Sequence, residues 1–286
     1  MLWRQVRRPR TFFPALGKRI SEDRVTTLAA ALAYYFFFAL FPFLIFLLSL
    51  VTLTPAAKGI EDWLLGRAGQ FVPGQAFEIL ETTIRSLLAQ PRSGLLSLGA
   101  VLALWSASAA VASVMDALNV AYRVPERRPW WKLRLKAIGL TVGLSFFMIL
   151  AFVLAVGTGP LVAWVSDILG PLSGIGLALV NWVVMLGAVT LVIATIYDQC
   201  PDVDLPFRWF SPGSVVFTAG FVTTTLAFSF YVGHFGSYDK TYGSLGAVIV
   251  LLLWMYLLAL LLLLGGELDG LLLTESRREQ GEDVPR

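Results

Sequence analysis

The chain has 286 residues, of which 57% are hydrophobic and only 14% are charged, and its mean hydropathy is +0.75. A water-soluble globule of this length needs far more polar surface, so the composition excludes that class and favours several membrane spans. The formal net charge is +3, and the single cysteine, Cys200, excludes an internal disulfide.

The N-terminal segment, residues 1–27, is basic and contains Trp3, Phe12, Phe13, Leu16 and Ile20. This mixture predicts an amphipathic helix that lies along the inner membrane interface. The apolar run that follows, from Leu28 to Leu53, is too long for the core of a signal peptide, and we predict that it is retained as the first span. Pro42 interrupts this run and removes one backbone hydrogen bond. It is a candidate hinge, and a static kink is the alternative.

Stretches with few or no charged residues define six predicted membrane spans. Their approximate bounds are 28–53, 95–115, 137–157, 175–197, 213–233 and 245–270. The last stretch is uncharged from Leu245 to Gly266, and as a helix it would cross roughly 33 Å, the hydrocarbon thickness of a bilayer. We therefore predict an all-α, polytopic membrane bundle in which residues 28–273 form the membrane domain and residues 274–286 a cytoplasmic tail.

The connection at residues 54–94 separates the first two predicted spans. Within it, Phe77, Leu80, Ile84, Leu87 and Leu88 recur at helical spacing, with charged residues on the opposite side. This periodicity predicts one or two amphipathic helices on the outer surface. Residues 59–90 are accordingly a candidate surface for binding another envelope protein.

The distribution of basic residues predicts the orientation of the bundle. If the N-terminus is cytoplasmic, the inner segments contain 17 of the 22 lysines and arginines, and the outer segments contain 5. Basic residues concentrate on the cytoplasmic side of membrane proteins, so this distribution favours both termini inside the cell.

Asp116 and Glu267 are the charged residues that lie deepest in the predicted spans, and they share a similar depth. An ionised carboxylate at such a depth costs several kcal/mol unless it is paired or hydrated. Asn119 and Arg123 follow Asp116 at helical spacing, and Arg24 precedes the first span. We predict that these five residues line a polar cavity open to the cytoplasm. The alternative is a set of ion pairs that only pins the bundle together.

The segment at residues 123–136 combines six cations with two adjacent tryptophans. This pattern is typical of a topology determinant and interfacial anchor. It also suits anionic lipid headgroups, for which the candidate contacts are Arg127, Arg128, Trp130, Trp131 and Lys132. Membrane lipids are therefore the expected partner. Nucleic acid is not, because an anionic membrane beside the segment would repel it.

No catalytic or metal-binding signature is evident in the sequence. There is no Walker-type loop and no cysteine pair, and His234 is the only histidine. Asp198, Asp202 and Asp204 lie close together but lack the glycine turn and terminal glutamate of a calcium loop. We predict no catalytic residue, cofactor or metal site, and the pattern weighs against an enzyme.

Blocks along nearly the whole chain carry a family resemblance. They are Asp23-Arg24, Leu32-Ala-Tyr-Tyr, Leu40-Phe-Pro42, Asp116-Ala-Leu-Asn119 with Tyr122-Arg123, Trp209-Phe-Ser-Pro212-Gly, and the segment from Gly236 to Glu267. These blocks resemble the YihY/virulence factor BrkB family of bacterial inner-membrane proteins, also labelled ribonuclease BN-like. The resemblance implies a six-span helical protein of the cytoplasmic membrane with both termini inside, and it transfers no activity to particular residues.

The leading functional hypothesis is transport or export of a lipid or another amphiphile through the predicted cavity. The family label suggests a membrane-bound ribonuclease instead, for which Asp198, Asp202 and Asp204 are the only candidate site. A third hypothesis, from another class, is an envelope scaffold that binds its partner through residues 59–90.

Overall fold

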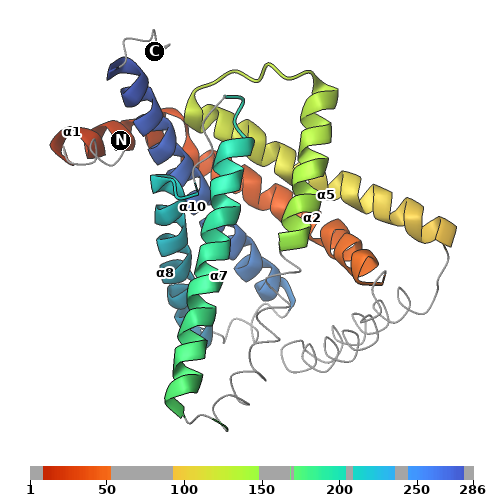
Figure 1. Ribbon diagram of the computed structural model, residues 1–286. Helices are drawn as coiled ribbons and strands as arrows, with labels where there is room; N and C mark the ends of the chain where they lie inside the picture. Colours follow the sequence, from red (N-terminus) through yellow and green to blue (C-terminus); the bar gives the residue numbers. More distant parts are fainter. Residues whose placement is uncertain are drawn as a thin grey trace. The chain divides into compact units, whose positions relative to one another are not determined.

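The computed structural model describes residues 9–52, 93–147, 168, 171–203, 209–235 and 244–279, and the described residues are helical apart from short turns (Figure 1). The helices are α1 (Pro9–Glu22), α2 (Val25–Thr52), α5 (Ser93–Tyr122), a helix at residues 130–147, α7 (Pro171–Gln199), α8 (Pro212–Phe235) and α10 (Ser244–Glu279). No strand occurs within these ranges. The predicted all-α class is therefore confirmed for the described part of the chain.

The helices follow the predicted spans to within a few residues, except at the C-terminal ends of α5 and α10, which run further. The predicted span at residues 137–157 begins inside the helix at residues 130–147 and continues beyond the described residues. Four segments are long and apolar enough to cross a membrane: Ala100–Tyr122, Ile175–Gln199, Pro212–Tyr231 and Val248–Arg277. A shorter apolar helix covers Val25–Leu40. The described residues thus contain four candidate spans where the sequence predicted six.

Large apolar side chains are exposed on the surfaces of α7 and α8. Trp182 and Val183 on α7, and Leu226 and Phe230 on α8, each expose more than half of their surface. A soluble monomer rarely presents apolar patches of this kind, whereas a helix that contacts lipid does so along its length. The exposed side chains therefore agree with the apolar composition of these helices.

The chain divides into two compact units. One comprises Met1–Phe37 and Ala110–Arg286, and the other comprises Phe38–Ala109, so the division passes through α2 and α5. Within the first unit, α10 packs against α1, α7 and α8, and α7 also packs against α8 (Figure 1). The candidate site described below lies entirely in this first unit.

Buried side chains from six helices form the core of the first unit: α2, α5, the helix at residues 130–147, α7, α8 and α10. They include Leu32 of α2, Met115 and Leu118 of α5, Tyr197 of α7 and Leu263 of α10. Burying side chains of this size excludes water from the space between the helices.

The predicted amphipathic N-terminal helix is present as α1, and it uses its apolar side within the protein. Phe12 is buried against Leu268, Leu271 and Leu272 of α10. The basic residues of α1 are thereby held beside the C-terminal part of α10.

Glycines let α10 approach its neighbours closely. A Cβ atom at Gly265 would overlap the Tyr197 hydroxyl, and one at Gly270 would overlap the backbone oxygen of Ala121. The Tyr197 hydroxyl donates to the carbonyl oxygen of Leu262 at 2.7 Å, which fixes α7 against α10. Small residues at helix contacts are the usual way to bring membrane helices together. The polar residues at the C-terminal end of α10 consequently lie close to the backbones of α5 and α8 and to the Tyr197 side chain of α7.

Candidate functional site

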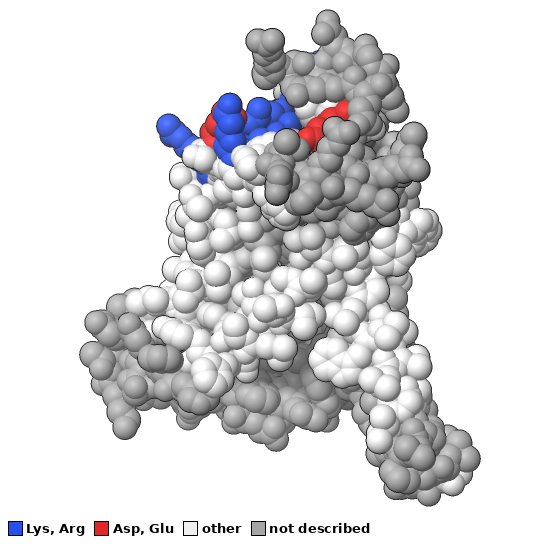
Figure 2. All heavy atoms as spheres, turned by 90° about the vertical axis from the view of Figure 1, so that its left-hand side faces the viewer, with Lys and Arg blue, Asp and Glu red and all other residues white. Residues whose placement is uncertain are grey.

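Segments from four parts of the sequence meet at one end of the first unit, which we call the polar end. Four contacts join them: Arg123 Nη2 to Glu22 Oε2 at 2.7 Å, Arg128 Nη2 to the Cys200 carbonyl oxygen at 2.9 Å, the Gly213 amide to Asp269 Oδ1 at 2.7 Å, and Arg19 Nη2 to Thr274 Oγ1 at 2.8 Å. On the face shown in Figure 2, the described charged residues gather at one end. Residues more than 250 positions apart in sequence are therefore neighbours here.

Asp269 of α10 caps the N-terminus of α8. Its buried carboxylate accepts the Gly213 hydrogen bond, and a negative charge at that position is also favoured by the helix dipole. Ser211 and Ser214 complete the cap, because the amide of each donates to the side-chain oxygen of the other at 3.0–3.1 Å. A Cβ atom at Gly213 would collide with the Asp269 side chain and with the backbone oxygen of Gly265. The buried charge of Asp269 is thus compensated by the fold.

Glu267, two residues earlier on α10, has no such compensation. The residue is 0% exposed, and neither carboxyl oxygen accepts a hydrogen bond from any described residue. The charged groups that act on it most strongly are Asp23, Arg19 and Arg123. Glu267 is therefore a buried carboxyl group under the influence of one other carboxyl group and two arginines.

The turn between α1 and α2 places Asp23 at this position. The amide of Asp23 donates to the carbonyl oxygen of Arg19 at 2.9 Å, and the next residue, Arg24, adopts a left-handed backbone with φ 48°. The Arg24 carbonyl then accepts the first hydrogen bonds of α2, from Thr27 and Leu28. This tight turn leaves the Arg24 side chain exposed and brings Asp23 toward α10.

Arg123 occupies the position after α5 that glycine most often fills. Its φ is 54°, its amide donates to the Val120 carbonyl oxygen, and the Val124 amide donates to the Asn119 carbonyl oxygen, both at 2.9 Å. These two bonds define a Schellman motif. The left-handed backbone conformation in this motif is usually adopted by glycine or asparagine, because it is unfavourable for other residues.

The Arg123 side chain explains why arginine stands at this position. Its Nη2 donates to Glu22 at 2.7 Å and its Nε donates to Asp23 at 3.3 Å. The pKa of Glu22 is lowered, mainly because Arg123 hydrogen-bonds to its carboxylate. The end of α5 is thereby tied to the turn between α1 and α2.

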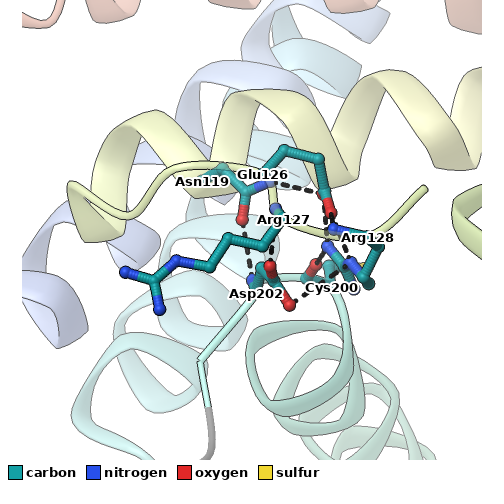
Figure 3. Close-up of polar contacts among 6 residues, drawn as sticks. All are labelled: Asn119, Glu126, Arg127, Arg128, Cys200 and Asp202. Atoms are coloured by element: carbon teal, nitrogen blue, oxygen red, sulfur yellow. Dashed lines mark hydrogen bonds and ion pairs between the residues drawn. The ribbon is translucent and has the colours of Figure 1, made fainter. Parts of the chain in front are cut away.

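A second polar group, the Asn119 cluster, comprises Asn119, Glu126, Arg128, Asp202 and the Cys200 carbonyl (Figure 3). Asn119 bridges two segments: its Nδ2 donates to Glu126 at 2.8 Å, and its Oδ1 accepts from the Asp202 amide at 2.7 Å. Arg128 donates to both oxygens of Glu126, at 2.7 and 2.6 Å, and to the Cys200 carbonyl. The cluster joins the segment after α5 to the turn after α7.

These contacts change the ionisation of the groups in the cluster. The pKa of Glu126 falls to about 2, chiefly because Arg128 donates to its carboxylate and despite an opposing effect of burial. Asp202 accepts from the Arg127 amide at 2.8 Å and lies 3.5 Å from Arg128 Nε. Burial raises the pKa of the neighbouring Cys200 thiol to about 12. Each carboxylate of the cluster therefore has donors, and Glu126 stays ionised at neutral pH.

The five residues of the predicted cavity fall into two groups. Arg123 is paired with Asp23 and acts electrostatically on Glu267, whereas Asn119 belongs to the Asn119 cluster. Asp116 is exposed on α5, and the charged groups that act on it are Glu126 and Arg128. Arg24 lies at the turn beside Asp23, with its side chain exposed.

The predicted lipid-headgroup contacts also divide. Trp130 and Trp131 are 70% and 54% exposed, Arg127 and Lys132 are exposed as well, and the Lys132 amine lies 5.3 Å from the ring centroid of Trp131. Arg128 instead points inward and has its hydrogen bonds within the Asn119 cluster. Four of the five residues are thus available to a lipid surface, and the fifth is a structural link.

The candidate hinge, Pro42, lies inside a continuous α2. The division between the two compact units falls between Phe37 and Phe38, and Phe38 is the residue whose carbonyl loses its helical donor because Pro42 has no N–H. The hinge stays a prediction. The candidate partner surface at residues 59–90 lies outside the described residues.

The candidate nuclease carboxylates have other contacts. Asp202 belongs to the Asn119 cluster, Asp198 accepts from the Gln199 side chain, and Asp204 lies outside the described residues. Among the residues that the structure describes, no group of three or more His, Cys, Asp or Glu side chains is placed to hold a metal ion.

Sequence reasoning missed Asp23, Glu126 and Asp269 as members of these groups. A signal was present for two of them. Asp23 directly precedes Arg24, and Asp269 lies two positions after Glu267, and both Arg24 and Glu267 were already candidate residues. Glu126 had none, since its contacts with Asn119 of α5 and with Arg128 of its own loop depend on how the loop folds back on α5.

Comparison with known proteins agrees with this architecture. The chain is 36% identical to a ribonuclease-like protein of Bacillus subtilis, YfkH, over 92% of its own length and 95% of the relative. It is 25% identical to a UPF0761 membrane protein of Tolumonas auensis, over 93% and 86% of the two chains, and 26% identical to one of Alteromonas mediterranea, over 97% and 92%. No solved structure matches. The model of the virulence factor BrkB family matches residues 16–286, and the chain is a membrane protein that belongs to this family.

Proposed function

We propose that the protein crosses the bacterial cytoplasmic membrane six times, with both termini in the cytoplasm. The contacts at the polar end support this topology, because they join the four segments predicted to be cytoplasmic from their charge. Two helices separate each such segment from the next: α2 and α5, the helix at residues 130–147 and α7, and α8 and α10. A chain that returns to the same end after every second helix crosses the membrane six times.

Within this topology, we propose that the protein transports or exports a lipid or another amphiphile. The observation that carries the proposal is Glu267, a fully buried carboxyl group on an apolar helix without a hydrogen-bond donor among the described residues. Burying an ionisable group in a membrane helix costs several kcal/mol, and such residues commonly mark substrate or ion pathways. Asp269 shows how the same helix compensates a buried carboxylate when its role is structural.

The surface beside the polar end suits the head of an amphiphile. Arg127 and Lys132 supply positive charge, while Trp130 and Trp131 supply rings of the kind that settle at the level of lipid headgroups. We propose that these four residues meet an anionic headgroup. The polar cavity is then formed around Arg24, Arg123 and Glu267, with Asn119 and Asp116 on its α5 side.

Reconstitution tests the transport proposal. Purified protein in liposomes should speed the movement of a fluorescent anionic phospholipid between leaflets, measured by chemical quenching of the outer leaflet. Glu267→Ala should reduce this rate at least tenfold. Thr223→Val, on the exposed surface of α8, is the matched control and should leave it unchanged. Equal rates for wild type, Glu267→Ala and protein-free liposomes would contradict transport of this class of lipid.

The nuclease alternative rests on the name of one relative. Purified protein with a divalent metal ion and RNA provides its test. Metal-dependent cleavage that disappears in Asp202→Asn, while the protein stays folded, would favour it over transport. The scaffold alternative predicts a stoichiometric partner crosslinked through residues 59–90.

A further inference from the structure

We propose that Trp209 and Phe210 form a lipid-binding surface, whose two rings insert among the phospholipid headgroups at the membrane surface beside the polar end. We refer to these two residues as the aromatic pair. This surface is distinct from the proposed transport activity. It also does not depend on which side of the membrane the polar end faces.

The aromatic pair is exposed directly before α8. Trp209 and Phe210 are 64% and 66% exposed, and both stand in a bend that leads into the helix. An apolar residue before a helix N-cap often packs on the first turn of that helix, against the fourth helical residue. Here that residue is Val215, which is itself 38% exposed. Phe210 is therefore not used to fold the start of α8, and its ring is available to a partner.

The N-terminal cap of α8 holds the backbone beside the aromatic pair. Ser211 and Ser214 exchange hydrogen bonds there, and Asp269 of α10 accepts the Gly213 amide. The side chains of all three capping residues are buried. A surface whose backbone is already fixed loses less conformational entropy when it binds. The fold thus presents the aromatic pair in a set position.

Close contacts show that α8 and α10 run antiparallel beside each other. A Cβ atom at Gly213 would overlap the backbone oxygen of Gly265, and one at Gly220 would overlap the side chain of Leu261. Positions that rise along α8 thus meet positions that fall along α10. The hydrogen bond between Gly213 and Asp269 consequently marks one common level on the two helices.

The lengths of the two helices place this level at the membrane surface. The candidate span Pro212–Tyr231 of α8 has 20 residues, which as a helix cover about 30 Å. From Val248, where the candidate span of α10 begins, to Asp269 there are 22 residues, or about 33 Å. Both lengths match the hydrocarbon thickness of a bilayer, roughly 30 Å. The aromatic pair, just before α8, therefore lies at the boundary between hydrocarbon and headgroups.

The surface of α8 continues from the aromatic pair into the hydrocarbon. An exposed stripe with a spacing of three or four residues runs along the helix, and its members are Val216, Ala219, Thr223, Leu226 and Phe230. This spacing keeps the side chains on one face of the helix. The aromatic pair stands at one end of the stripe, so that lipid covering α8 reaches it without interruption.

The chemistry of the two residues selects a lipid surface as the partner. Tryptophan combines a large apolar ring with one N–H donor, and such rings concentrate where hydrocarbon meets headgroups. Past the same level, α10 continues to Glu279 through the polar sequence Thr274-Glu-Ser-Arg-Arg-Glu279. Glu267 lies two residues on the other side of Asp269, which places it about 3 Å inside the boundary.

Spin labels at three depths test the proposal on the full-length protein. Nitroxides are attached to Phe210→Cys, Thr223→Cys and Arg277→Cys in a Cys200→Ala background, in liposomes of phosphatidylethanolamine and phosphatidylglycerol. Thr223 lies about 15 Å inside the level of Gly213, and Arg277 lies about 12 Å outside the level of Asp269. The ratio of collisions with oxygen to collisions with a water-soluble nickel chelate should be highest at residue 223 and lowest at residue 277. At residue 210 it should be intermediate and severalfold above residue 277.

Two results with the labelled proteins would overturn the proposal. One is a ratio at residue 210 equal to that at residue 277, which would place the aromatic pair in water. The other is spin–spin broadening at residue 210 that disappears on dilution with unlabelled protein, which would make a second copy of the chain the occupant.

Tryptophan fluorescence provides a measurement that keeps Cys200, in case the Cys200→Ala background does not fold. The difference between the emission of wild type and of Trp209→Phe isolates the signal of Trp209. Phospholipids brominated near the headgroup should quench this difference more than phospholipids brominated near the chain ends. A difference signal that neither lipid quenches would overturn the proposal.

Discussion

The Asn119 cluster and Glu267 lie at the same polar end, but their carboxyl groups have opposite surroundings. In the Asn119 cluster, Glu126 accepts four hydrogen bonds, from Asn119 and from three N–H groups of Arg128. Glu267, in contrast, accepts none from the described residues. Carboxylates with donors stabilise the fold in one fixed state, while a carboxyl group without donors gives the protein a choice of protonation state.

Their positions in the chain account for the difference. Glu126 and Arg128 stand in a short non-helical segment, where backbone amides are free to donate to side chains. Glu267 stands inside α10, where the backbone amides are used by the helix itself. A carboxylate on a helix interior needs donors from other elements, and α8 supplies one to Asp269 but not to Glu267.

Breaking the Asn119 cluster should have the largest effect. Arg128→Ala removes three N–H donors from the side chain and leaves Glu126 and Asp202 without their cation, which we expect to cost about 3 kcal/mol. Arg127→Ala is the matched control, since only its backbone amide takes part in the cluster. Thermal unfolding should separate the two variants by several degrees.

The Cys200 thiol provides a second measurement of the same prediction. Alkylation of this buried thiol should be slow in wild type and in Arg127→Ala but fast in Arg128→Ala. Equal alkylation in all three proteins would contradict the assigned role of Arg128.

Asp269 and Glu267 provide a comparison on a single helix. Asp269→Asn weakens the charge-assisted bond to the Gly213 amide and should lower stability by about 1–2 kcal/mol. Glu267→Gln replaces a carboxyl group that lacks a donor and should be neutral or stabilising. Melting temperatures of the two variants, measured in the same detergent, check this. The reverse order would show that Glu267 has a donor in the folded protein.

The pH dependence of stability should report on Glu126. Its folded pKa of about 2 lies below the ordinary value of 4.5, so its contribution is complete above pH 4.5 and is lost as the pH falls toward 2. After solvent screening we expect this contribution to be on the order of 1–2 kcal/mol. Glu126→Gln should flatten the acid limb of the melting-temperature curve. An unchanged acid limb would place the titration elsewhere.

Arg123 should give the smallest effect. Both Arg123→Ala and Arg123→Gly remove the contacts with Glu22 and Asp23, but glycine tolerates the left-handed backbone. Arg123→Gly should therefore be more stable than Arg123→Ala by about 1 kcal/mol. Chemical denaturation of the two purified variants measures this difference. No difference would mean that the end of α5 rearranges when the side chain is lost.

The sequence was sufficient for the helices and for part of the site. Uncharged runs predicted α2, α5, α7, α8 and α10 because membrane spanning imposes a length and a composition on a helix. The depth argument singled out Glu267, which is fully buried in the structure, and its membership of a cavity stays a prediction. Both signals are local and can be counted along the chain.

The contact partners of each polar residue could not be predicted from local sequence patterns, because they depend on how the helices pack. Depth along a helix says nothing about which side of it faces which neighbour, so Asp116 and Glu267 were predicted to share a cavity although different charged groups act on each. Arg128 was assigned to the lipid surface with its neighbours because its contacts with Cys200 and Asp202 depend on the packing of α7. The close approach of Leu118 to Gly266, where a Cβ atom would overlap it, likewise depends on the packing of α5 on α10.

The most direct test of the contrast between the two groups is the melting temperature of Glu126→Gln and Glu267→Gln at neutral pH. Each variant exchanges one carboxyl group for an amide of the same shape. If Glu126 is an ionised carboxylate that accepts four hydrogen bonds and Glu267 is a buried carboxyl group that accepts none, Glu126→Gln melts several degrees below wild type and Glu267→Gln melts at or above it. A fall of equal size in both variants would contradict the account.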